Sequence, residues 1–368
     1  MRRDASRKRI RDKSVERAVK RGLIRAMRVL VRSMRSRTGL PPPPDWDSGA
    51  PRVLYLRYDH VGDMILATGI IRGIAAAHPR LMVDVLASRS NASVLAGNPY
   101  IGRVVLFEKK RPWTWLRTLR AIRGARYDAV IDTKVRSPSF TDAAIMLLSG
   151  ARHRIGVAGR ATDVVLTLPV APTRGAVHYV DYSTALATAF GVPVEDRDWR
   201  PEIVLRPDER VWAEARWREA GEGTRLLVNV SAGDRSRYWP WDRFAAAVRA
   251  LRAARGDRAL VALVVGTPSD QVRAERIAAA SGGMAVATRS VRDAFALVEA
   301  SDAVLTADTS ITHAASAFGK PAVALFPLGR GALYGPYRTG GRVVSTPAPA
   351  IDSLPAEPVI RALTEVVR

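Results

Sequence analysis

The sequence contains no cysteine among its 368 residues. Disulfides, thiolate nucleophiles and cysteine-ligated zinc are therefore excluded, and the absence fits a reducing compartment. Histidine is also scarce, with five residues in the whole sequence. These five lie far apart, and none stands in a metal-ligand spacing such as HExxH. We therefore expect no protein-bound metal ion.

Long apolar runs are missing as well. No segment approaches the roughly 18 unbroken apolar residues of a membrane-spanning helix, and the amino terminus lacks the apolar core of a signal peptide. We therefore expect a cytoplasmic protein that is not secreted. With 47% hydrophobic residues over 368 positions, the chain is long enough for two globular domains.

Several catalytic motifs are also absent. The loop after the first predicted strand has no GxGxxG, so dinucleotide binding of the dehydrogenase type lacks its motif. Gly319 and Lys320 precede Pro321 and lack the spacing of a Walker loop, and no Ser/His/Asp motif occurs. Hydrolase and kinase interpretations therefore lose support.

Positive charge is what the sequence has in excess. Residues 1–37 hold fifteen Lys and Arg against three Asp and Glu, about half of the formal net charge of +23. Apolar residues recur there at helical spacing, with arginines between them, at Val19, Leu23, Met27, Leu30, Val31 and Met34. The pattern predicts a basic amphipathic helix for an anionic membrane surface, where each Lys or Arg adds about 1 kcal/mol of attraction.

Two alternatives stay open for this basic extension, a solvated, partly disordered segment and a nucleic-acid-binding segment. No aromatic residue precedes Trp46, which disfavours stacking on single-stranded nucleic acid. The prolines from Pro41 to Pro44 predict a stiff spacer before the folded part.

Beyond the spacer, β-prone runs alternate with helical patterns. Strands are predicted near 53–56, 82–86, 104–107, 128–132, 153–157, 226–229, 260–265, 285–288 and 304–306. Helices are predicted near 64–77, 90–96, 113–123, 139–148, 178–190, 207–220, 241–254, 291–300 and 357–367, with one more after Pro268. The alternation indicates an α/β protein with two doubly wound, Rossmann-like parallel sheets.

This pattern predicts four parts of the chain. They are a basic extension with a Pro-rich linker at 1–47, one Rossmann-like domain at 48–203, a second at 204–345, and a C-terminal segment at 346–368. We expect the helix of the last segment to pack back on the first domain.

Ligands bind beyond the carboxyl ends of strands in such sheets, so the loops that follow strands are the candidates. The first unusual loop carries Asp59, Gly62 and Asp63 ahead of a helix. Gly62 permits a tight turn or the close approach of a ligand. Asp63 stands where it can face a cleft, but Asp is also a favoured helix cap, so both roles stay open.

The second unusual loop runs from Asn229 to Pro240. Its small residues, which leave backbone N–H groups open to a ligand, are Ser231, Ala232 and Gly233. Arg235 and Arg237 can neutralise an oxyanion. A polar loop with surface arginines is the plain alternative in so basic a protein.

The third loop lies in the stretch from Val304 to Leu325, which reads as strand, polar loop, helix and strand. Gly319 and Pro321 predict the end of a helix of about ten residues. Its start would attract anions, phosphates above all. The polar candidates are Asp308, Thr309, Ser310, Thr312 and His313. A capping role for Asp308 and a structural role for His313 are the alternatives.

Taken together, the three loops resemble glycosyltransferase family 9, the heptosyltransferases of lipopolysaccharide core synthesis, over most of 53–336. The family pattern R-x-D-x-x-G-D after a strand is met by Arg57, Asp59, Gly62 and Asp63. The small-residue turn and basic residue before W-P are met by Asn229 to Gly233, Arg237, Trp239 and Pro240. The D-T-G-x-x-H-x-A-x-A segment followed by G-x-P is matched by Asp308, Thr309, His313, Ala315, Ala317, Gly319 and Pro321.

The resemblance implies a GT-B fold, with the acceptor on the N-terminal domain and the nucleotide sugar on the C-terminal domain. It also implies inversion at the anomeric carbon without a metal or other cofactor. Asp63 becomes the general base, and the acceptor-side loop consists of Arg57, Asp59 and Gly62. The implied donor site consists of Asn229, Ser231, Ala232, Gly233, Arg237, Asp308, Thr309, Ser310, Thr312 and His313, with Asp270 for the ribose.

The implied donor is an ADP-sugar, first of all ADP-heptose. The implied acceptor is a lipopolysaccharide core or another lipid-linked saccharide at the inner face of the plasma membrane. The sequence departs from the family pattern where Arg237 stands for the common Lys, Ser310 for Gly and Val230 for Pro. A glycosyltransferase with another nucleotide sugar, and a non-catalytic nucleotide-sugar or nucleic-acid-binding protein, stay open as alternatives.

Overall fold

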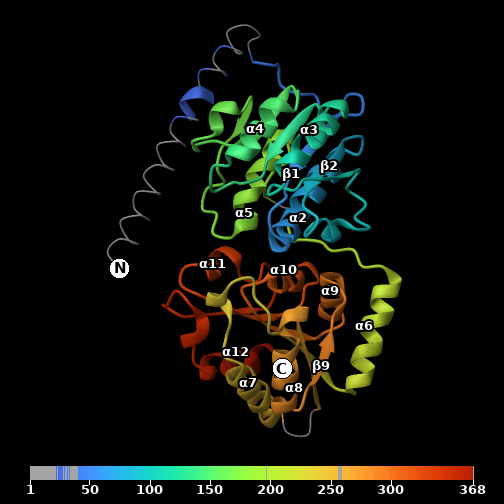
Figure 1. The fold of residues 1–368 in the computed structure, drawn as a ribbon, viewed down its shortest axis with the longest axis vertical. Coiled ribbons are helices and arrows are strands. Elements are labelled where there is room, and N and C mark those ends of the chain that lie inside the picture. Colours follow the sequence, from blue (N-terminus) through green and yellow to red (C-terminus); the bar gives the residue numbers. More distant parts are fainter. Residues whose placement is uncertain are drawn as a thin grey trace.

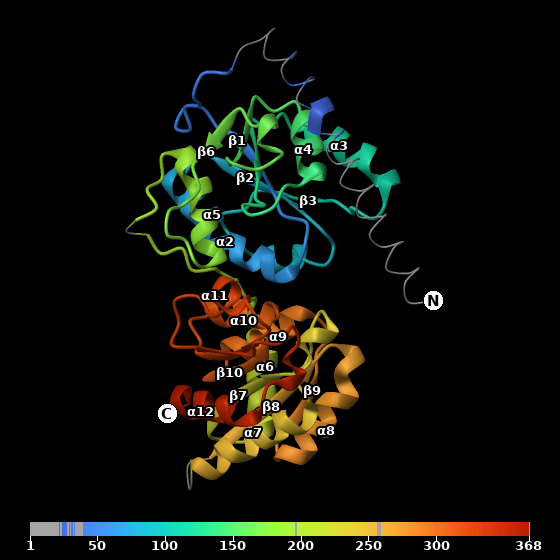
Figure 2. The same cartoon turned by 90° about the vertical axis from the view of Figure 1, so that its left-hand side faces the viewer.

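The computed structural model describes residues 22, 24–27, 29, 31, 33, 40–195, 197–255 and 259–367. Two bodies lie one above the other along the long axis, each made of a sheet and its surrounding helices (Figure 1). The view turned by 90° gives the same two layers (Figure 2). We call these two bodies the N-terminal domain and the C-terminal domain.

The N-terminal domain contains a parallel sheet with the strand order β3-β2-β1-β4-β5-β6. Its strands are β1 (Arg52–Leu56), β2 (Met82–Ala87), β3 (Val104–Leu106), β4 (Ala129–Asp132), β5 (His153–Val157) and β6 (Leu168–Val170). Its α-helices are α2 (Val61–Ala77), α3 (Trp115–Gly124), α4 (Phe140–Leu148) and α5 (Tyr179–Thr184). Consecutive residues of β1 are buried on both faces, as expected for a parallel sheet covered by helices on each side.

The C-terminal domain contains a second parallel sheet with the strand order β12-β11-β10-β7-β8-β9. Its strands are β7 (Thr224–Asn229), β8 (Leu260–Gly266), β9 (Met284–Ala287), β10 (Ala303–Ala307), β11 (Ala322–Phe326) and β12 (Arg342–Ser345). Its helices are α6 (Pro207–Ala220), α7 (Trp241–Ala254), α8 (Gln271–Ser281), α9 (Val291–Glu299), α10 (Ser310–Ala317), α11 (Gly331–Tyr334) and α12 (Ala356–Val366).

Both sheets repeat one strand order. Counted within its own domain, each sheet has its first strand beside its fourth at the centre, β1 beside β4 and β7 beside β10. At each of these pairs the order of strands reverses, which opens a crevice beyond their carboxyl ends. The predicted pair of doubly wound α/β sheets is therefore confirmed, and all three unusual loops follow strands of these central pairs.

The sequence pattern did not predict two short edge strands, β6 and β12. Strand β6 has three residues with Pro169 at its centre, and β12 is largely exposed. A strand at a sheet edge has only one neighbour, so it tolerates proline and needs no apolar run.

Helix α12 does not return to the N-terminal domain as expected. Its apolar residues Val359, Ala362 and Leu363 are buried with residues of α7 and of the C-terminal sheet. The helix contacts α7, β11 and β12. The expected packing on the first domain is therefore wrong. Helix α12 packs on the second domain because it follows the edge strand β12 after a short link, and adjacent elements usually pack together.

The connection between the domains, of which residues 191–195 and 197–206 are described, lies against α2 at Trp199 and Arg200. An added Cβ on Gly69 would overlap the backbone of Trp199, and one on Gly73 would overlap its indole ring. Glycine at these two helix positions therefore lets the connection lie against α2. The domain boundary expected between residues 203 and 204 falls within this connection and stays a proposal.

Several hydrogen bonds join the domains on one side of α2. The His178 ring donates through Nε2 to the carbonyl of Gly335 at 3.1 Å, because its Nδ1 accepts the N–H of Val180. The Tyr337 hydroxyl donates to the Asp181 carboxylate at 2.8 Å.

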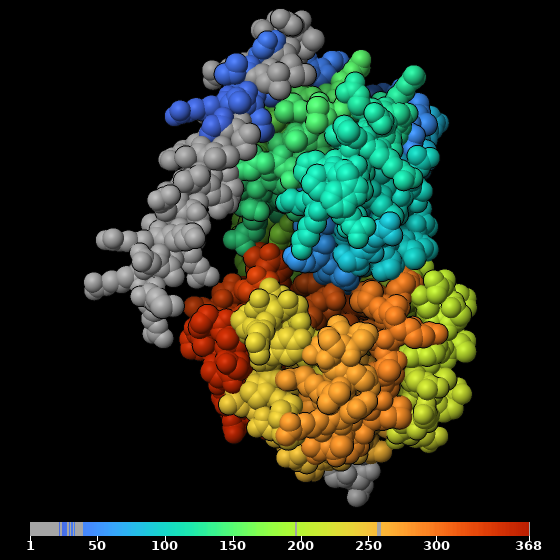
Figure 3. Space-filling view, viewed as in Figure 1, coloured from blue at the N-terminus to red at the C-terminus, as the bar shows by residue number. Residues whose placement is uncertain are grey.

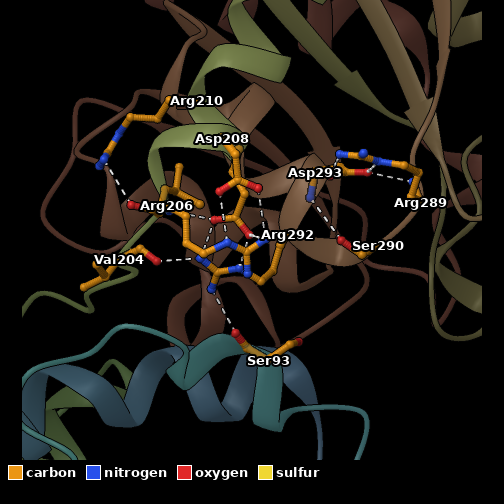
Figure 4. Close-up of polar contacts among 11 residues, drawn as sticks. Ser93, Val204, Arg206, Asp208, Arg210, Arg289, Ser290, Arg292 and Asp293 are labelled. Carbon is orange, nitrogen blue, oxygen red and sulfur yellow. Dashed lines mark hydrogen bonds and ion pairs between the residues drawn. The ribbon is translucent and has the colours of Figure 1, made fainter.

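Arg292 of α9 joins the domains on the other side (Figure 4). Its guanidinium is buried and donates to both carboxylate oxygens of Glu209, at 2.5 and 2.6 Å. It also donates to the carbonyl of Val204 in the connection and, at 2.9 Å, to the carbonyl of Ser93 in the N-terminal domain. One side chain therefore ties together α6, α9, the connection and the opposite domain.

Of the basic extension, the structure describes eight residues between 22 and 33, all of them helical. Val31 is buried in the cluster of apolar residues to which α3 and α4 contribute, and Met27 packs against the same cluster. Val29 is exposed. The expectations for residues 1–21, 23, 28, 30, 32 and 34–39 lie outside the described residues, and the membrane helix stays a prediction. Within the described part of the chain, no helix combines the length and apolar character needed to cross a bilayer.

Candidate functional site

A cavity of about 390 Å³ lies between the domains, where the two crevices face each other. The N-terminal domain contributes His60, Val61 and Gly62 at the start of α2. The C-terminal domain contributes residues from the loops after β7, β8, β9 and β10. The volume lies within the range of about 300–1,000 Å³ that is typical of small-molecule sites.

Thr309 and Asn229 fix the start of α10 in the cavity wall through hydrogen bonds. Thr309 caps the helix, because its hydroxyl accepts the N–H of Ile311 at 3.2 Å. The side-chain amide of Asn229, at the end of β7, donates to the hydroxyls of Thr306 at 2.9 Å and Thr309 at 3.3 Å. Ser310 lines the cavity at the first helical position, where a backbone N–H has no partner within the helix. The wall therefore presents a helix start with its partial positive charge.

Asp308 gathers two arginines beside this helix start. Its buried carboxylate lies 2.5 Å from Nε of Arg330 and 3.4 Å from Nε of Arg237. Arg237 also donates to the backbone carbonyl of Asp308 at 3.2 Å. The guanidinium of Arg330 stacks on the ring of Tyr334, 4.7 Å from its centroid. Two guanidinium groups against one carboxylate leave a net positive charge next to the cavity.

The opposite crevice collects carboxylates around a buried cation. The Arg57 guanidinium lies 3.5 Å from the Asp59 carboxylate and 3.9 Å from the Asp63 carboxylate, and Lys134 lies 2.8 Å from Asp59. Burial alone would lower the pKa of Arg57, but Tyr179 and both carboxylates raise it above its ordinary value. Burial acts to raise the pKa of Asp59, yet Arg57 and Lys134 outweigh it and lower that pKa. Asp63 keeps 21% of its side chain exposed.

A protonatable pair lies beneath the same loop. The Tyr58 hydroxyl donates to the carboxylate of Asp142 on α4. Burial and the nearby Asp132 carboxylate raise the pKa of Asp142 to about 7. Burial and Asp142 in turn raise the pKa of Tyr58. The Lys134 ammonium lies over the Tyr58 ring, 5.3 Å from its centroid.

Gly62 lies where the N-terminal domain closely approaches α10 of the C-terminal domain. An added Cβ on this residue would lie 2.7 Å from Cδ2 of His313 and 3.6 Å from Cα of Ser310. Burial, the nearby His178 ring and the Arg330 guanidinium lower the pKa of His313 to about 3. His313 is therefore a neutral packing partner of Gly62 at neutral pH.

The structure brings most of the predicted donor residues into one wall. The wall contains Gly62 and, from the C-terminal domain, Asn229, Ser231, Ala232, Gly233, Arg237, Asp308, Thr309 and Ser310. Arg57 and Asp59 belong to the loop before Gly62, and Asp63 follows it in the first turn of α2. None of the three lines the cavity itself.

Of the described residues that were predicted to bind the donor, Asp270, Thr312 and His313 are not part of this wall. The Asp270 carboxylate accepts hydrogen bonds from Ser231 at 2.6 Å, Thr267 at 2.8 Å and Tyr238 at 3.1 Å. The Thr312 hydroxyl donates to the carbonyl of Ala307 at 3.2 Å. Their roles toward a donor stay predictions.

The sequence reasoning missed Arg330, Lys134 and Arg289. Each follows the carboxyl end of a strand, β11 for Arg330, β4 for Lys134 and β9 for Arg289. Arg289 lines the cavity and pairs with Asp293 at 2.9 Å. The rule that ligands bind beyond strand ends would have singled out all three loops had it been applied to every strand.

A cluster of three or more His, Asp or Glu side chains able to hold a metal ion does not occur among the residues that the structure describes. Arg237, Arg330 and the start of α10 are positive groups that the site offers to an anion.

The comparisons with known proteins agree with this arrangement. A sequence model of glycosyltransferase family 9 (heptosyltransferase) matches residues 115–354. A comparison with curated proteins gives no match. Among solved structures, a glycosyltransferase of family 9 from Veillonella parvula DSM 2008 aligns with a TM-score of 0.76 and 17% identity, over 88% of this chain and 98% of that chain.

Two Escherichia coli structures are similar in the same way. ADP-heptose lipopolysaccharide heptosyltransferase II aligns with a TM-score of 0.68 and 20% identity, over 86% of this chain and 98% of that chain. Heptosyltransferase WaaC with ADP aligns with a TM-score of 0.67 and 17% identity, over 85% of this chain and 97% of that chain. At such low identities, the structural similarity shows a shared fold and no more. The GT-B architecture implied by the resemblance is confirmed.

Proposed function

Because this chain belongs to glycosyltransferase family 9, we propose that it moves a heptose or a similar sugar from an ADP-sugar to a lipopolysaccharide core or another lipid-linked acceptor. The observation that supports this most strongly is the interdomain cavity, which joins the Gly62 loop to the start of α10 and the arginines around Asp308. We propose inversion at the anomeric carbon and a reaction that needs no metal or other cofactor.

In this proposal Asp63 is the general base. Its partly exposed carboxylate adjoins the cavity residues 60–62, so it can take the proton of an acceptor hydroxyl as that oxygen attacks the anomeric carbon. Arg57 holds the carboxylate through an ion pair and donates to the backbone carbonyl of the same residue at 3.1 Å. Asp59 and Lys134 complete the acceptor side of the loop.

The nucleoside diphosphate leaves as an anion, and the C-terminal wall offers donors for its growing charge. The backbone of Ser310 at the start of α10, the small residues 231–233 and the Arg237 guanidinium are the proposed contacts. Asp308 fixes Arg237 and Arg330 at this place. We propose that it acts through these arginines in addition to the donor contact that the resemblance implies.

The nucleoside itself fits the other end of the cavity. There the wall is formed by Gly266, Thr267 and Pro268 after β8 and by residues 288–291 after β9, with apolar side chains from Val265 and Ala294. An apolar wall with polar rims suits a purine and its ribose.

We further propose that the enzyme works at the cytoplasmic face of the inner membrane, as a peripheral protein on an anionic surface. The positive charge of residues 1–37 supports this. Nucleic acid is not among the proposed partners.

A thermal-shift screen with ADP, UDP and GDP, and with their sugars, tests the donor class. Binding to the folded state raises the melting temperature, and the gain is about 2.7 kcal/mol at a concentration of 100 Kd. We expect the largest shift with the ADP compounds. A larger shift with UDP or GDP compounds would replace ADP-heptose by another nucleotide sugar, the alternative that Arg237, Ser310 and Val230 keep open.

A further inference from the structure

One surface of the N-terminal domain combines exposed apolar side chains with dense positive charge. Trp113 is 74% exposed and Leu116 is 65% exposed. The exposed cations around them are Lys109, Lys110, Arg111, Arg117, Arg120 and Arg123. No Asp or Glu occurs from residue 109 to residue 124. We call this region the 109–123 surface.

The fold buries one face of this segment and leaves the other exposed among the residues that the structure describes. The inner face of α3 packs on the domain through the buried residues Thr118 and Ile122, and the Trp115 ring lies 5.4 Å from that of Phe107. Leu116, Arg117 and Arg120 occupy the outer face of the helix, where they are exposed. An exposed indole and an exposed leucyl group three residues apart, among six exposed cations, are typical of an interaction site.

The 109–123 surface is connected to the proposed acceptor loop. The segment before α3 follows β3, whose carboxyl end lies at the same edge of the parallel sheet as the loop after β1. The ring of Tyr58 in that loop makes an edge contact with Phe107 at 4.8 Å, and Phe107 contacts Trp115. Figure 3 shows the segment, coloured teal, on the front of the upper domain.

We propose that the 109–123 surface docks on an anionic lipid bilayer, with Trp113 and Leu116 in the headgroup region and the cations facing lipid phosphates. Tryptophan and leucine in a segment rich in Lys and Arg have the composition of interfacial membrane segments. The inference rests on the proposed function, because a docked surface next to the Tyr58 loop would present a lipid-linked acceptor to the cavity.

Flotation of the full chain with vesicles tests this proposal. The vesicles contain either neutral phosphatidylcholine alone or phosphatidylcholine with one third phosphatidylglycerol. We expect binding to the anionic vesicles only, and release at high salt, because screening weakens the attraction between exposed charges. Binding to both vesicle types alike, or to neither of them, would overturn the proposal.

Two pairs of variants locate the docking surface. Trp113→Ala with Leu116→Ala should reduce the partition coefficient roughly tenfold, because two partly immersed apolar groups are lost. Arg117→Glu with Arg120→Glu should reduce it about thirtyfold or more, since each cation adds about fivefold. The matched controls are Val211→Ala with Val272→Ala, and Arg218→Glu with Arg361→Glu, all at exposed positions of the C-terminal domain.

The controls should bind within about twofold of the wild type, whereas controls as damaging as the 109–123 variants would show that position does not matter. Transfer to a water-soluble acceptor fragment should stay unchanged in every variant. Its failure in the wild type would refute the proposed function and leave the flotation result intact. Binding of the wild type to RNA, with no binding to anionic vesicles, would assign the surface to nucleic acid instead and reject the bilayer.

Discussion

The two domains share a strand order and differ in the chemistry of their crevices. The C-terminal crevice presents small polar residues, the start of α10 and two arginines around one buried carboxylate, Asp308. The N-terminal crevice presents two carboxylates, Asp59 and Asp63, gathered on the buried Arg57. The first arrangement suits a departing anion, and the second suits the removal of a proton.

The comparison teaches that the fold supplies two equivalent places and that a few loop residues decide their roles. Both crevices lie at the centre of a sheet with one topology. The difference lies in the charges of the loops, since Asp59 and Asp63 share Arg57 in the N-terminal crevice. In the C-terminal crevice, Arg237 and Arg330 share Asp308 beside a capped helix start. Variants that exchange or weaken these features test the division of labour.

Loss of the N-terminal carboxylate should have the largest effect. We expect Asp63→Asn to reduce kcat between about 10² and 10⁴-fold, because a positioned base typically contributes that much to proton removal. Single-turnover transfer measures it. Asp352→Asn, at an exposed position far along the chain from the cavity loops, is the control. Turnover of Asp63→Asn close to that of the control would reject the role of this carboxylate.

Loss of a C-terminal cation should act on donor binding. We expect Arg237→Met to raise the donor KM between about tenfold and a hundredfold, since hydrogen bonds to charged groups contribute about 1.5–3 kcal/mol. Arg235→Met, two residues earlier and exposed, is the matched control. Equal effects of the two variants would mean that only the overall charge matters.

A methyl group added between the two crevices should lower kcat/KM and push the domains apart. Gly62→Ala would place its Cβ 2.7 Å from the buried His313 ring, and overpacking of this kind costs about 1–3 kcal/mol. We expect roughly a tenfold lower kcat/KM and a wider separation of the domains in small-angle X-ray scattering. Gly340→Ala, with open space around the added Cβ, should leave both unchanged.

The smallest effect should be on stability. The folded state raises the pKa of Asp142 to about 7, so between pH 4 and 7 it binds more protons than the unfolded chain. This contribution to stability is lost as the pH rises through that window and is constant above it. Asp142→Asn removes the titration, so its melting temperature relative to the wild type should rise by a few degrees between pH 5 and pH 8. A difference independent of pH would contradict the assignment.

Much of the site could be predicted from the sequence because loops after strands are short and carry unusual residues. Asp63, Arg237 and Thr309 are visible as motif positions. The ion pair of Arg330 with Asp308 was not predictable, since 22 residues separate them and only the packing of α11 brings them together. The burial of His313 against Gly62 was not predictable either, because a motif position says nothing about packing across the domains.

The edges of the fold were harder to predict than its centre. Strand β8 is a continuous apolar run and was predicted, whereas β6 and β12 lack such a run. The place of α12 depends on which apolar face is left open after the sheet has formed, and the helix pattern alone does not specify it.

Calorimetric titration of ADP into the wild type, Asp63→Asn and Arg237→Met tests the division of labour most directly. We expect Asp63→Asn to bind ADP with a Kd within about twofold of the wild type while its transfer activity is lost. Arg237→Met should bind ADP at least about tenfold more weakly. Weaker ADP binding in Asp63→Asn together with unchanged binding in Arg237→Met would contradict the assignment of the base to one crevice and the diphosphate to the other.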